Sequence, residues 1–416
     1  MLTVRDAAEQ IVAAMVPLGT ERVRLRDALG RVLAERAVSP LDLPPWDNAS
    51  MDGYAVRSSD VSGASRESPI TLALIGSVAA GSSATRPLAA GQAYRIMTGA
   101  PVPPGADSVI RVEDTDAGTE RVTVLDARDA GRNVRPRGED VSSGSVAIEG
   151  ETLLAAAHLG VLASTGHADV MVYRRPRVAI LTTGDELVDI DRFAEVLRGE
   201  RIVTSNSYTL EGLVRSAGGV PVMLGLAPDD PAALIERLSA APPHDLLLTS
   251  GGVSVGEYDY TRRVLEQLGG TLRFWRVKIR PGAPLGFGVL GGVPWLGLPG
   301  NPVSTMVTFE IFVRPALRRM QGLSRVFAIP VPVRNSERIT TAARLTHFLR
   351  AIVRPASDGV LEARLTGPQG SGLLTGMARA NALVVVPEDR TIVEPGDSLS
   401  AVLLGDDALL GDRVLV

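Results

Sequence analysis

The sequence changes character at Leu246-Leu247-Leu248-Thr249-Ser250-Gly251-Gly252-Val253-Ser254-Val255-Gly256-Glu257-Tyr258-Asp259, where an apolar run enters a turn rich in glycine and hydroxyl groups. A helical pattern follows from Thr261. The apolar run predicts a buried strand, so the stretch is predicted to be a strand, a turn and the start of a helix. Glycines let a backbone approach a ligand closely, and N–H and hydroxyl donors at such a turn favour an anion. We therefore predict an anion-binding turn with Asp259 as an adjacent metal ligand, although a Gly-Gly turn on its own is more often a plain connection.

Strand and helix patterns alternate between Arg177 and Met320. Short apolar runs predict strands, and the segments between them carry helical spacing or helix-capping residues. Strands are expected at 178–181, 202–204, 220–226, 246–248 and 293–296, and a long helix at 303–320. This alternation is typical of a doubly wound α/β sheet with parallel strands, which binds ligands at the carboxyl ends of its strands.

Three turns should meet at that edge of the sheet. They are Thr182–Glu186, the turn quoted above and Leu298–Ser304. Together they bring carboxylates to the site: Asp185, Glu186 and Asp259, with Asp230 as a further candidate. Carboxylates repel a bound anion unless a cation lies among them, and Mg²⁺ bridges carboxylates and phosphate oxygens. The turns therefore predict Mg²⁺ and an anionic substrate. The alternative makes Asp185 and Asp230 helix caps, which is the commoner role for an acid at the position of Asp230.

The other segments predict further domains. Residues 1–40 have helical character, with apolar spacing at Asp6–Met15 and a short second helix at Leu25–Leu29, and another helix is expected from Leu153. These segments indicate a helical linking domain of residues 1–43 and 146–176. β-branched segments separated by turn residues indicate an inserted β-rich domain at 44–145. The α/β domain then occupies 177–327. Strand patterns at 383–386, 398–404 and 413–416 indicate a C-terminal β-barrel or sandwich at 328–416, so the fold class is multi-domain, α/β plus β.

Composition and charge exclude several classes of protein. The 416 residues include 45% hydrophobic and 22% charged residues, which is typical of a globular protein. A net charge of −4 and only 4% aromatic residues argue against nucleic-acid binding. The chain has no cysteine, which excludes disulfides and thiolate chemistry. Acids near the start and the lack of an apolar run of ~18 residues predict neither a signal peptide nor a membrane span, so we expect a cytoplasmic protein.

Motifs of other enzyme classes are absent. The chain contains no G-x-x-x-x-G-K-[ST] and no G-x-G-x-x-G after the first strand of the α/β domain, which argues against P-loop nucleotidases and dinucleotide-binding enzymes. The histidines lack metal-ligand spacing, and we expect them to be surface or packing residues: His158, His167, His244 and His347. No serine has an accompanying histidine–acid pair, so serine-hydrolase chemistry has little support.

Basic residues alternate in Arg276-Val277-Lys278-Ile279-Arg280, which contains the single lysine of the chain. On a strand, this alternation would place the three basic side chains on one face. That face is predicted to be either a basic wall near an anion site or a solvated surface.

Seven motifs occur in order along the chain. They are NASMDGYAV at Asn48–Val56, MTGAP at Met97–Pro101, RGEDV at Arg137–Val141, TTGDEL at Thr182–Leu187, TSGGVSVGEYDY at Thr249–Tyr260, RPGAP at Arg280–Pro284 and LPGNPVS at Leu298–Ser304. In these motifs, and over essentially its whole length, the chain resembles the molybdopterin molybdenumtransferase (MoeA) family, to which the C-terminal domain of gephyrin also belongs. The resemblance implies the final step of molybdenum cofactor assembly. In that step, molybdate is inserted into the dithiolene of adenylylated molybdopterin, and AMP is released in a Mg²⁺-dependent reaction.

The resemblance also implies roles for individual residues. The acidic site residues of the family correspond to Asp52, Asp140, Glu186 and Asp259, and the metal ligands are expected among Glu186, Asp230 and Asp259. Which acid orients the attacking water stays open. Substrate contacts are expected from the three strand-end turns, the basic residues and the C-terminal loop: Thr183, Gly184, Asp185, Ser250, Gly251, Gly252, Ser254, Arg280, Pro299, Gly300, Asn301, Pro302, Ser304, Arg137, Arg350 and Ser371.

Two positions depart from the family pattern. Ala283 stands where many members have a second basic residue, which leaves one anion contact unfilled, and Lys278 is a candidate substitute. Gly372 follows Ser371 where many members have histidine. The sequence does not separate molybdate from tungstate as the substrate, because the two anions are nearly equal in size and charge.

Two other functions stay open on the sequence alone. One is a molybdopterin adenylyltransferase, which catalyses the preceding step and would consume ATP and release pyrophosphate. The other is a non-enzymatic scaffold, because the related domain of gephyrin binds receptor tails. The additional β domains and the acids of the motifs favour the molybdate-inserting enzyme. The resemblance also implies a homodimer with the site between the α/β domain of one subunit and the β domain of the other. An adenylyltransferase and molybdoenzyme-maturation proteins are the expected partners.

Overall fold

The computed structural model describes residues 1–252, 260–405 and 408–409 of the chain. The chain forms two compact units. The first comprises Met1–Glu21, Gly30–Val32 and Val172–Val416, and the second comprises Arg22–Leu29 and Leu33–Met171. The finer division into four domains remains a prediction.

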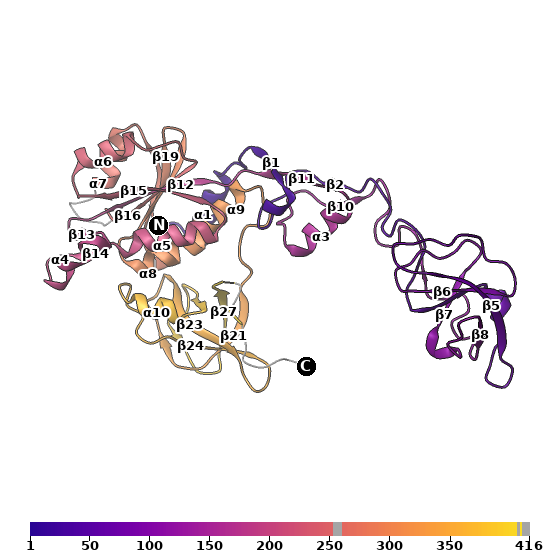
Figure 1. Ribbon diagram of the computed structural model, residues 1–416. Coiled ribbons are helices and arrows are strands. Elements are labelled where there is room, and N and C mark those ends of the chain that lie inside the picture. The colour runs from indigo at the N-terminus through magenta and orange to yellow at the C-terminus, as the bar shows by residue number, and fades with distance from the viewer. Residues whose placement is uncertain (253–259, 406–407, 410–416) are drawn as a thin grey trace. The chain divides into compact units, whose positions relative to one another are not determined.

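The first unit contains the predicted α/β sheet. Its strand order is β15-β12-β16-β20-β19-β17, and β15, β12, β16 and β20 are parallel (Figure 1). β19 is antiparallel to both of its neighbours, β20 and β17. The strands span Val220–Ala227 (β15), Arg177–Thr183 (β12), Leu246–Ser250 (β16), Val293–Leu298 (β20), Pro284–Leu290 (β19) and Thr271–Arg276 (β17). The four parallel strands therefore end at one edge, as the alternating sequence pattern predicts.

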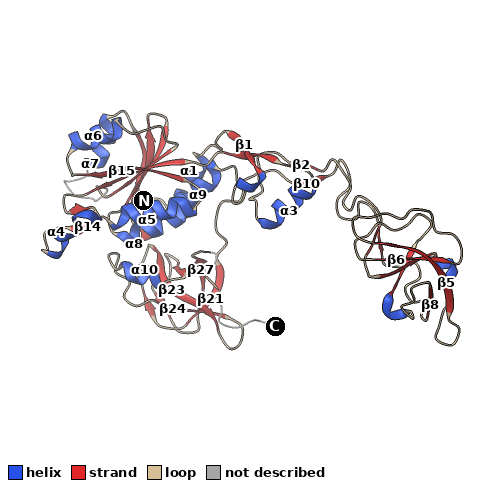
Figure 2. Cartoon of the chain, in the orientation of Figure 1, coloured by secondary structure: helices blue, strands red, loops and turns tan. Residues whose placement is uncertain are grey.

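Helices cover both faces of this sheet (Figure 2). Side chains alternate along a strand, so Val178 and Ile180 of β12 face one layer and Ala179 and Leu181 face the other. The first layer contains α1 (Val4–Ala13), α5 (Ser205–Ser216), α8 (Pro302–Thr308) and α9 (Arg314–Met320), and the second contains α6 (Pro231–Ser239) and α7 (Tyr260–Gln267). A π-helical turn at Phe309–Val313 joins α8 to α9, so residues 302–320 form the long helical segment that was expected. The sheet is doubly wound, as predicted.

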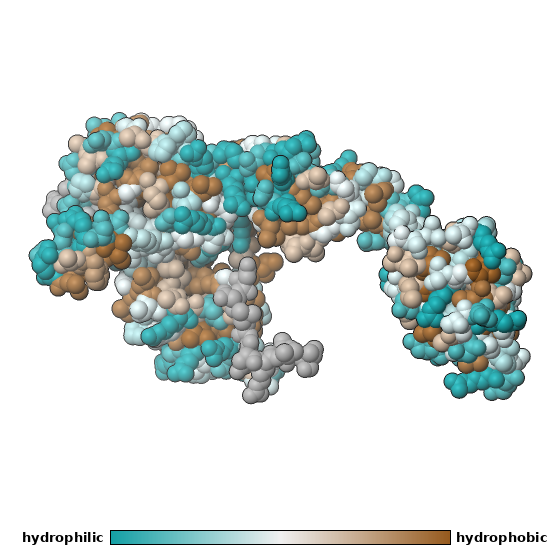
Figure 3. Space-filling model, viewed as in Figure 1, coloured by the Kyte–Doolittle hydropathy of each residue, from teal (hydrophilic) through white to brown (hydrophobic). Residues whose placement is uncertain are grey.

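A small excursion leaves the sheet after β12. It contains β13 (Leu187–Val188), a 3₁₀ turn at Ile190–Arg192, α4 (Phe193–Leu197) and β14 (Ile202–Val203). The strand expected at 202–204 exists, but it pairs only with β13, outside the main sheet. Phe193 and Leu197 are exposed, and apolar atoms are visible on the surface of this segment (Figure 3).

The C-terminal part of the first unit is a closed five-stranded barrel. Its strands follow the order β23-β24-β21-β27-β25, and β25 pairs back onto β23. They span Thr346–Pro355 (β23), Leu361–Leu365 (β24), Val331–Asn335 (β21), Ser398–Leu403 (β27) and Ala382–Val386 (β25), with β22 (Ile339–Thr340), β26 (Ile392–Val393) and α10 (Leu374–Arg379) at the rim. The prediction of a barrel-like domain is confirmed. The strand expected at 413–416 lies outside the described residues.

The prediction that Arg276, Lys278 and Arg280 share one face of a strand is wrong. β17 ends at Arg276, and a separate short strand, β18 (Ile279–Arg280), pairs in parallel with β23 of the barrel. Lys278 lies between the two strands, and its Nζ atom is 3.5 Å from Glu388 Oε2. The three basic side chains therefore do not belong to one strand face.

The second unit is rich in β structure, as predicted. Its main sheet has the order β7-β4-β6-β5-β8, with strands at Ser108–Arg111, Gly53–Val56, Gln92–Ile96, Ile70–Val78 and Arg121–Val124. Shorter strands are β2 (Ala37–Val38), β3 (Asn48–Ala49), β9 (Val134–Arg135) and β10 (Val146–Ile148), and the helices are α2 (Ser58–Val61) and α3 (Ala156–Ser164), with 3₁₀ turns at Leu25–Asp27 and Val112–Asp114. Tyr54, Leu72 and Ile110 belong to its core.

The first forty residues are less helical than expected. α1 is present, but residues 20–24 are strand β1 (Thr20–Arg24), which pairs with β11 (Asp169–Tyr173), and the second helix is only the 3₁₀ turn at Leu25–Asp27. Strand pairing over more than a hundred residues decides this segment, and local spacing does not reveal it. Among the described residues, no helix combines the length and apolarity that a membrane span requires.

Candidate functional site

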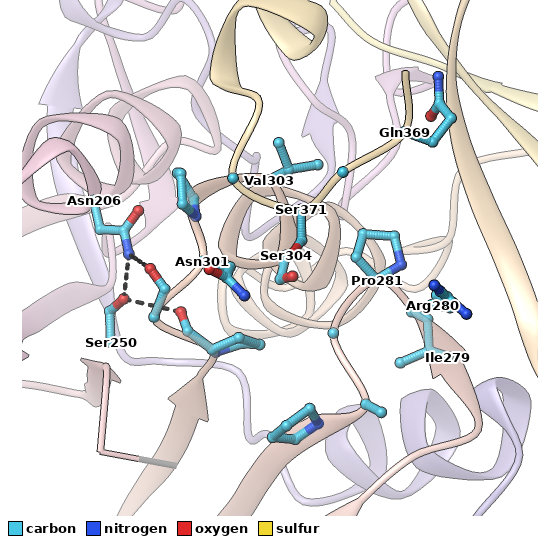
Figure 4. A pocket seen from close by; sticks show the side chains of 18 of the residues that line it. Asn206, Ser250, Ile279, Arg280, Pro281, Asn301, Val303, Ser304, Gln369 and Ser371 are labelled. Carbon is cyan, nitrogen blue, oxygen red and sulfur yellow. Dashed lines mark hydrogen bonds between the residues drawn. The ribbon is translucent and has the colours of Figure 1, made fainter. Parts of the chain in front are cut away.

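A cleft of about 1260 Å³ lies where the carboxyl ends of the parallel strands face the barrel. Its lining comes from four groups of segments: 182–187 and 202–206 beside β12 and β14, 250–252 and 299–304 after β16 and β20, 279–284 around β18, and residues of the barrel between Arg338 and Gly372. In Figure 4, Asn301, Ser304 and Ser371 lie between the Asn206–Ser250 pair on one side and Arg280 on the other. The predicted edge of the sheet is therefore a hollow with polar walls.

The strand-end turns meet in this cleft and pack against one another through their backbones. Gly251 has a φ of +96°, and a Cβ atom at this position would lie 2.4 Å from the carbonyl oxygen of Thr183. A Cβ atom on Gly300 would lie 3.6 Å from the Cα atom of Gly251. The turn after β16 is thus enclosed between those after β12 and β20, and only glycine fits at 251.

An asparagine that the sequence interpretation missed joins two of these turns. Asn206 is 8% exposed, and its Nδ2 atom donates to Ser250 Oγ and to the carbonyl oxygen of Gly300, each at 2.8 Å. Ser250 Oγ in turn donates to the carbonyl oxygen of Pro299 at 3.2 Å (Figure 4). Asn206 Oδ1 is buried without a hydrogen-bond partner among the described residues. The only sequence signal was its place near the start of a helix that follows a strand.

Two arginines provide positive charge in the cleft without a carboxylate partner in the described chain. Arg280 is exposed at the end of β18. Arg350 on β23 is 1% exposed, and its side chain donates to oxygens of Gln369, Leu373 and Pro368. Burial lowers the pKa of Arg350, but the guanidinium remains charged because its usual pKa is far above neutrality. A third arginine on the lining, Arg338, is paired with Glu394.

His347, expected to be an ordinary packing residue, is buried beside this charge. It is 4% exposed, and its Nε2 atom lies 3.0 Å from the carbonyl oxygen of Ala342. Burial lowers the pKa of His347, the charge of Arg280 adds to this effect, and the Ala342 bond opposes it. The imidazole is therefore neutral near pH 7 and adds no third cation to the cleft wall.

Carboxylates cluster next to the turn after β12. Glu186 and Asp229 line the cleft, and Asp185 Oδ1 accepts the backbone N–H of Asp229 at 3.1 Å. Burial raises the pKa of Asp229, and the nearby charges of Asp185 and Glu186 raise it further. Asp229 was not among the site residues expected from the sequence. Burial and the two neighbouring carboxylates therefore act in the same direction on Asp229.

Asp230 has a different place. Its Oδ1 atom accepts the backbone N–H of Ala233 at 2.9 Å and caps α6, which matches the alternative role given to it above, and it does not line the cleft. Among residues 1–252, 260–405 and 408–409, no three acidic or histidine side chains are grouped so as to enclose a metal ion. Ser254 and Asp259 lie outside the described residues.

The remaining predicted site residues belong to the second unit. Asp52 Oδ1 accepts the backbone N–H and the hydroxyl of Thr98, each at 2.7 Å, and these bonds hold the pKa of Asp52 below its usual value. Arg137 Nε donates to Asp42 Oδ2 at 2.6 Å. Asp140 is exposed, and its backbone N–H donates to the carbonyl oxygen of Leu43.

The structure thus gathers most predicted substrate contacts into one cleft, together with the predicted catalytic acid and metal ligand Glu186: Thr183, Gly184, Ser250, Gly251, Gly252, Arg280, Pro299, Gly300, Asn301, Pro302, Ser304, Arg350 and Ser371. Asp185 is not on the lining, but its carboxylate accepts the backbone N–H of Asp229, which is. The cleft combines glycine-rich turns, two arginines that pair with no carboxylate in the described part of the chain, and neighbouring acids, which suits an anionic ligand that carries a cation with it.

Comparisons with known proteins agree with these features. Three family models match consecutive parts of the chain: the MoeA N-terminal region (domain I and II) at residues 2–166, a probable molybdopterin binding domain at 179–319, and the MoeA C-terminal region (domain IV) at 332–404. A molybdopterin molybdenumtransferase of Nostoc sp. is 39% identical over 407 residues, covering 95% of this chain and 92% of the relative. One of Haemophilus influenzae is 35% identical over 404 residues, covering 96% and 98%. The crystal structure of a molybdopterin biosynthesis moeA protein from Pyrococcus horikoshii has a TM-score of 0.84 at 30% identity, covering 97% and 100%.

Proposed function

Because the chain belongs to the molybdopterin molybdenumtransferase (MoeA) family, we propose that it inserts molybdate into adenylylated molybdopterin with Mg²⁺-dependent release of AMP. Its relatives are transferases of molybdenum cofactor biosynthesis, and the chain is an enzyme of that class. The resemblance and the cleft together support the more specific reaction.

One observation carries the proposal: Arg280 and Arg350, which have no carboxylate partner among the described residues, line the same cleft as the glycine-rich turns after β16 and β20. Both molybdate and the phosphoanhydride of the adenylylated pterin are anions. Arginines bind such oxyanions through paired N–H donors, and glycine-rich turns bind phosphate through the backbone. We therefore assign the turns at Ser250–Ser254 and Pro299–Ser304 to the pterin phosphate, and Arg280 and Arg350 to anionic oxygens.

The donor chemistry near the turn after β12 is consistent with Mg²⁺. Mg²⁺ is usually held by one or two carboxylates and completed by substrate phosphates, so two acids suffice. We propose Glu186 and Asp229 as those acids, with Asp259 as a predicted third. Asp229 replaces Asp230, whose carboxylate already caps a helix. When bound, the ion would polarise the phosphoanhydride. The protein's own part is to hold the phosphate at the turns and to offer two carboxylates that have no arginine partner among the described residues.

Roles for Asp52, Asp140 and Arg137 remain predictions from the resemblance. We also propose a homodimer in the cytoplasm that receives its substrate from an adenylyltransferase and passes its product to molybdoenzyme-maturation proteins. Substitution of Asp52 by Asn tests its role, since Thr98 can still bond to the amide oxygen while the charge is removed.

The function is tested by incubating the purified protein with adenylylated molybdopterin, MgCl₂ and molybdate, and measuring AMP by chromatography. AMP release that requires molybdate supports the proposal. ATP consumption with pyrophosphate release would favour the adenylyltransferase instead. Capture of a partner protein without binding of the pterin would favour the scaffold. The Asp259→Ala variant should lose AMP release and keep its fold, and near-normal turnover would remove Asp259 from the site.

A further inference from the structure

We infer that Gln369 is a positioning residue that keeps the positive charge of Arg350 uncompensated and available to an oxyanion in the cleft. The inference rests on the proposed function, because that function gives the cleft an anionic substrate, molybdate. Nothing in the sequence pattern singled out Gln369, which precedes the Gly370-Ser371-Gly372 loop.

The surroundings of Arg350 are unusual for a buried charge. Its Nη1 atom donates to the carbonyl oxygen of Leu373 at 2.8 Å, its Nη2 atom to that of Pro368 at 2.9 Å, and its Nε atom to Gln369 Oε1 at 3.3 Å. All three acceptors are neutral, and the described chain offers this guanidinium no carboxylate. A buried charge is costly unless it is paired. Arginine has five N–H donors, so two remain for an anion from the cleft.

Both the oxygen and the nitrogen of the Gln369 side-chain amide form hydrogen bonds with Arg350. Its Oε1 atom also accepts the backbone N–H of Arg350 at 2.9 Å, and its Nε2 atom donates to the carbonyl oxygens of Arg350 and Gly367 at 3.2 and 2.9 Å. A glutamate would fit the same space, but it could not donate to those carbonyls and would neutralise the guanidinium. Glutamine therefore fixes the arginine and contributes no negative charge.

The same segment connects Arg350 to the rest of the cleft. Gln369 and the three residues that follow it all line the cleft, and the carbonyl oxygen of Ser371 accepts the N–H of Val303 at 3.1 Å. On the other side, a Cβ atom on Gly376 would lie 3.5 Å from Arg350 Nη1, so α10 packs closely against the guanidinium. Arg350 has little freedom to move towards a ligand, and Gln369 determines where its charge lies.

Two substitutions separate charge from support. Gln369→Glu keeps an acceptor for Arg350 but cancels its charge, whereas Gln369→Met removes the hydrogen bonds and leaves the charge. The binding of sodium molybdate is measured by calorimetric titration, and we expect the unchanged protein to bind it most tightly. Gln369→Met should bind molybdate about threefold more weakly and Gln369→Glu at least about tenfold more weakly, because hydrogen bonds to charged groups are stronger than those to neutral groups. A purely structural clamp predicts the opposite order of the two variants. Gln10→Glu, an equal change on the exposed face of α1, should leave the affinity unaltered.

Kinetics and stability complete the test. If AMP release is measurable, Gln369→Glu should raise the KM for molybdate and leave the KM for adenylylated molybdopterin within about twofold, because the pterin contacts are on other turns. Thermal unfolding identifies a variant that fails to fold. In that case, the test is the molybdate affinity of the remaining variant compared with that of the unchanged protein. Equal molybdate affinities, the reversed order or no binding to the unchanged protein would each overturn the inference. Molybdate binding in the expected order without AMP release would contradict the proposed function and support the role of Gln369.

Discussion

The side-chain amide of Asn206 donates a hydrogen bond to Ser250 Oγ at 2.8 Å and joins the start of α5 to the turn that follows β16. The same Nδ2 atom reaches the carbonyl oxygen of Gly300 in the turn after β20. One buried amide therefore holds two of the three strand-end turns in register, and the shape of this wall of the cleft depends on it.

Asn206→Ala should weaken both stability and substrate binding. Removing the donor shared by a buried acceptor, Ser250 Oγ, and a partly buried one, the carbonyl oxygen of Gly300, costs about 1–3 kcal/mol, so we expect a melting temperature lower by several degrees. The KM for adenylylated molybdopterin should rise at least about fivefold, because the turns that hold its phosphate lose their common support. Asn381→Ala is the control: Asn381 bonds to both backbone groups of Val353 in the barrel, at 2.7 and 2.8 Å. It should lose similar stability with no change in KM. Equal KM values for both variants would refute a special role for Asn206.

Gly251→Ala should be far more damaging than an ordinary glycine substitution. Both a positive φ and a 2.4 Å clash with the carbonyl oxygen of Thr183 oppose the added methyl group. We expect a loss of more than about 2 kcal/mol of stability and little AMP release. Gly131→Ala has a comparable φ of +73° but open space around the new Cβ atom, so it should cost only about 1–2 kcal/mol. Comparable melting temperatures for the two variants would show that the turns can separate without penalty.

The raised pKa of Asp229 predicts how stability changes with pH. A carboxyl group whose pKa is higher in the folded than in the unfolded state binds more protons when folded, so the stability it contributes falls as pH rises from about 4 through the raised pKa. At neutral pH, Asp229 is ionised in both states, and the full cost of burying its charge lowers the stability of the folded protein. Without Mg²⁺, Asp229→Asn should therefore raise the melting temperature at pH 7 by about 1–3 °C, and this difference should shrink towards pH 4. A constant difference across that range would mean that neither the burial of Asp229 nor the neighbouring acids raise its pKa.

Mg²⁺ should act on the same residue. Addition of MgCl₂ should raise the melting temperature of the unchanged protein, because an ion that binds only the folded state stabilises it, and Asp229→Asn should abolish the increase. Asp230→Ala should lose about 1 kcal/mol through its missing helix cap but respond to MgCl₂ normally. The reverse pattern would restore Asp230 as the ligand in place of Asp229.

Ala283→Lys should strengthen oxyanion binding. Ala283 lines the cleft, whereas Lys278, the candidate substitute, does not line it and is paired with Glu388. A lysine at 283 adds a charge where many family members have one, so molybdate should bind about threefold to tenfold more tightly at low salt, and less so at high salt. Lys278→Met should leave the affinity unchanged. A loss of affinity in Lys278→Met would show that this lysine reaches the anion after all.

Much of the fold could be predicted because the buried strands of the α/β sheet are short apolar runs, as at Leu246–Leu248, followed by turns with glycine. The same pattern located the edge of the sheet and the turns that line the cleft. It failed at residues 20–24 and 276–280, because β1 and β18 are held by pairing with distant strands, β11 and β23. Asn206 escaped notice for a similar reason, since its partners lie 44 and 94 residues away.

The acids illustrate the other limit of sequence reasoning. Asp229 and Asp230 are adjacent and chemically identical, yet one faces the cleft and the other caps α6. A pattern of acids predicts that a cation is needed, but only the backbone geometry decides which oxygen is free. Gln369 has no charge and belongs to none of the seven family motifs, so only the structure reveals its bonds to Arg350.

The most direct test is a single-turnover experiment that counts AMP and inserted metal together. Protein loaded with adenylylated molybdopterin and MgCl₂ is mixed with molybdate, and AMP and pterin-bound molybdenum are measured over time. We predict one AMP released for each molybdenum inserted, with no release when molybdate is left out. AMP release that proceeds equally without molybdate, or tight pterin binding with no release at all, would contradict the assignment of this chain as the molybdate-inserting enzyme.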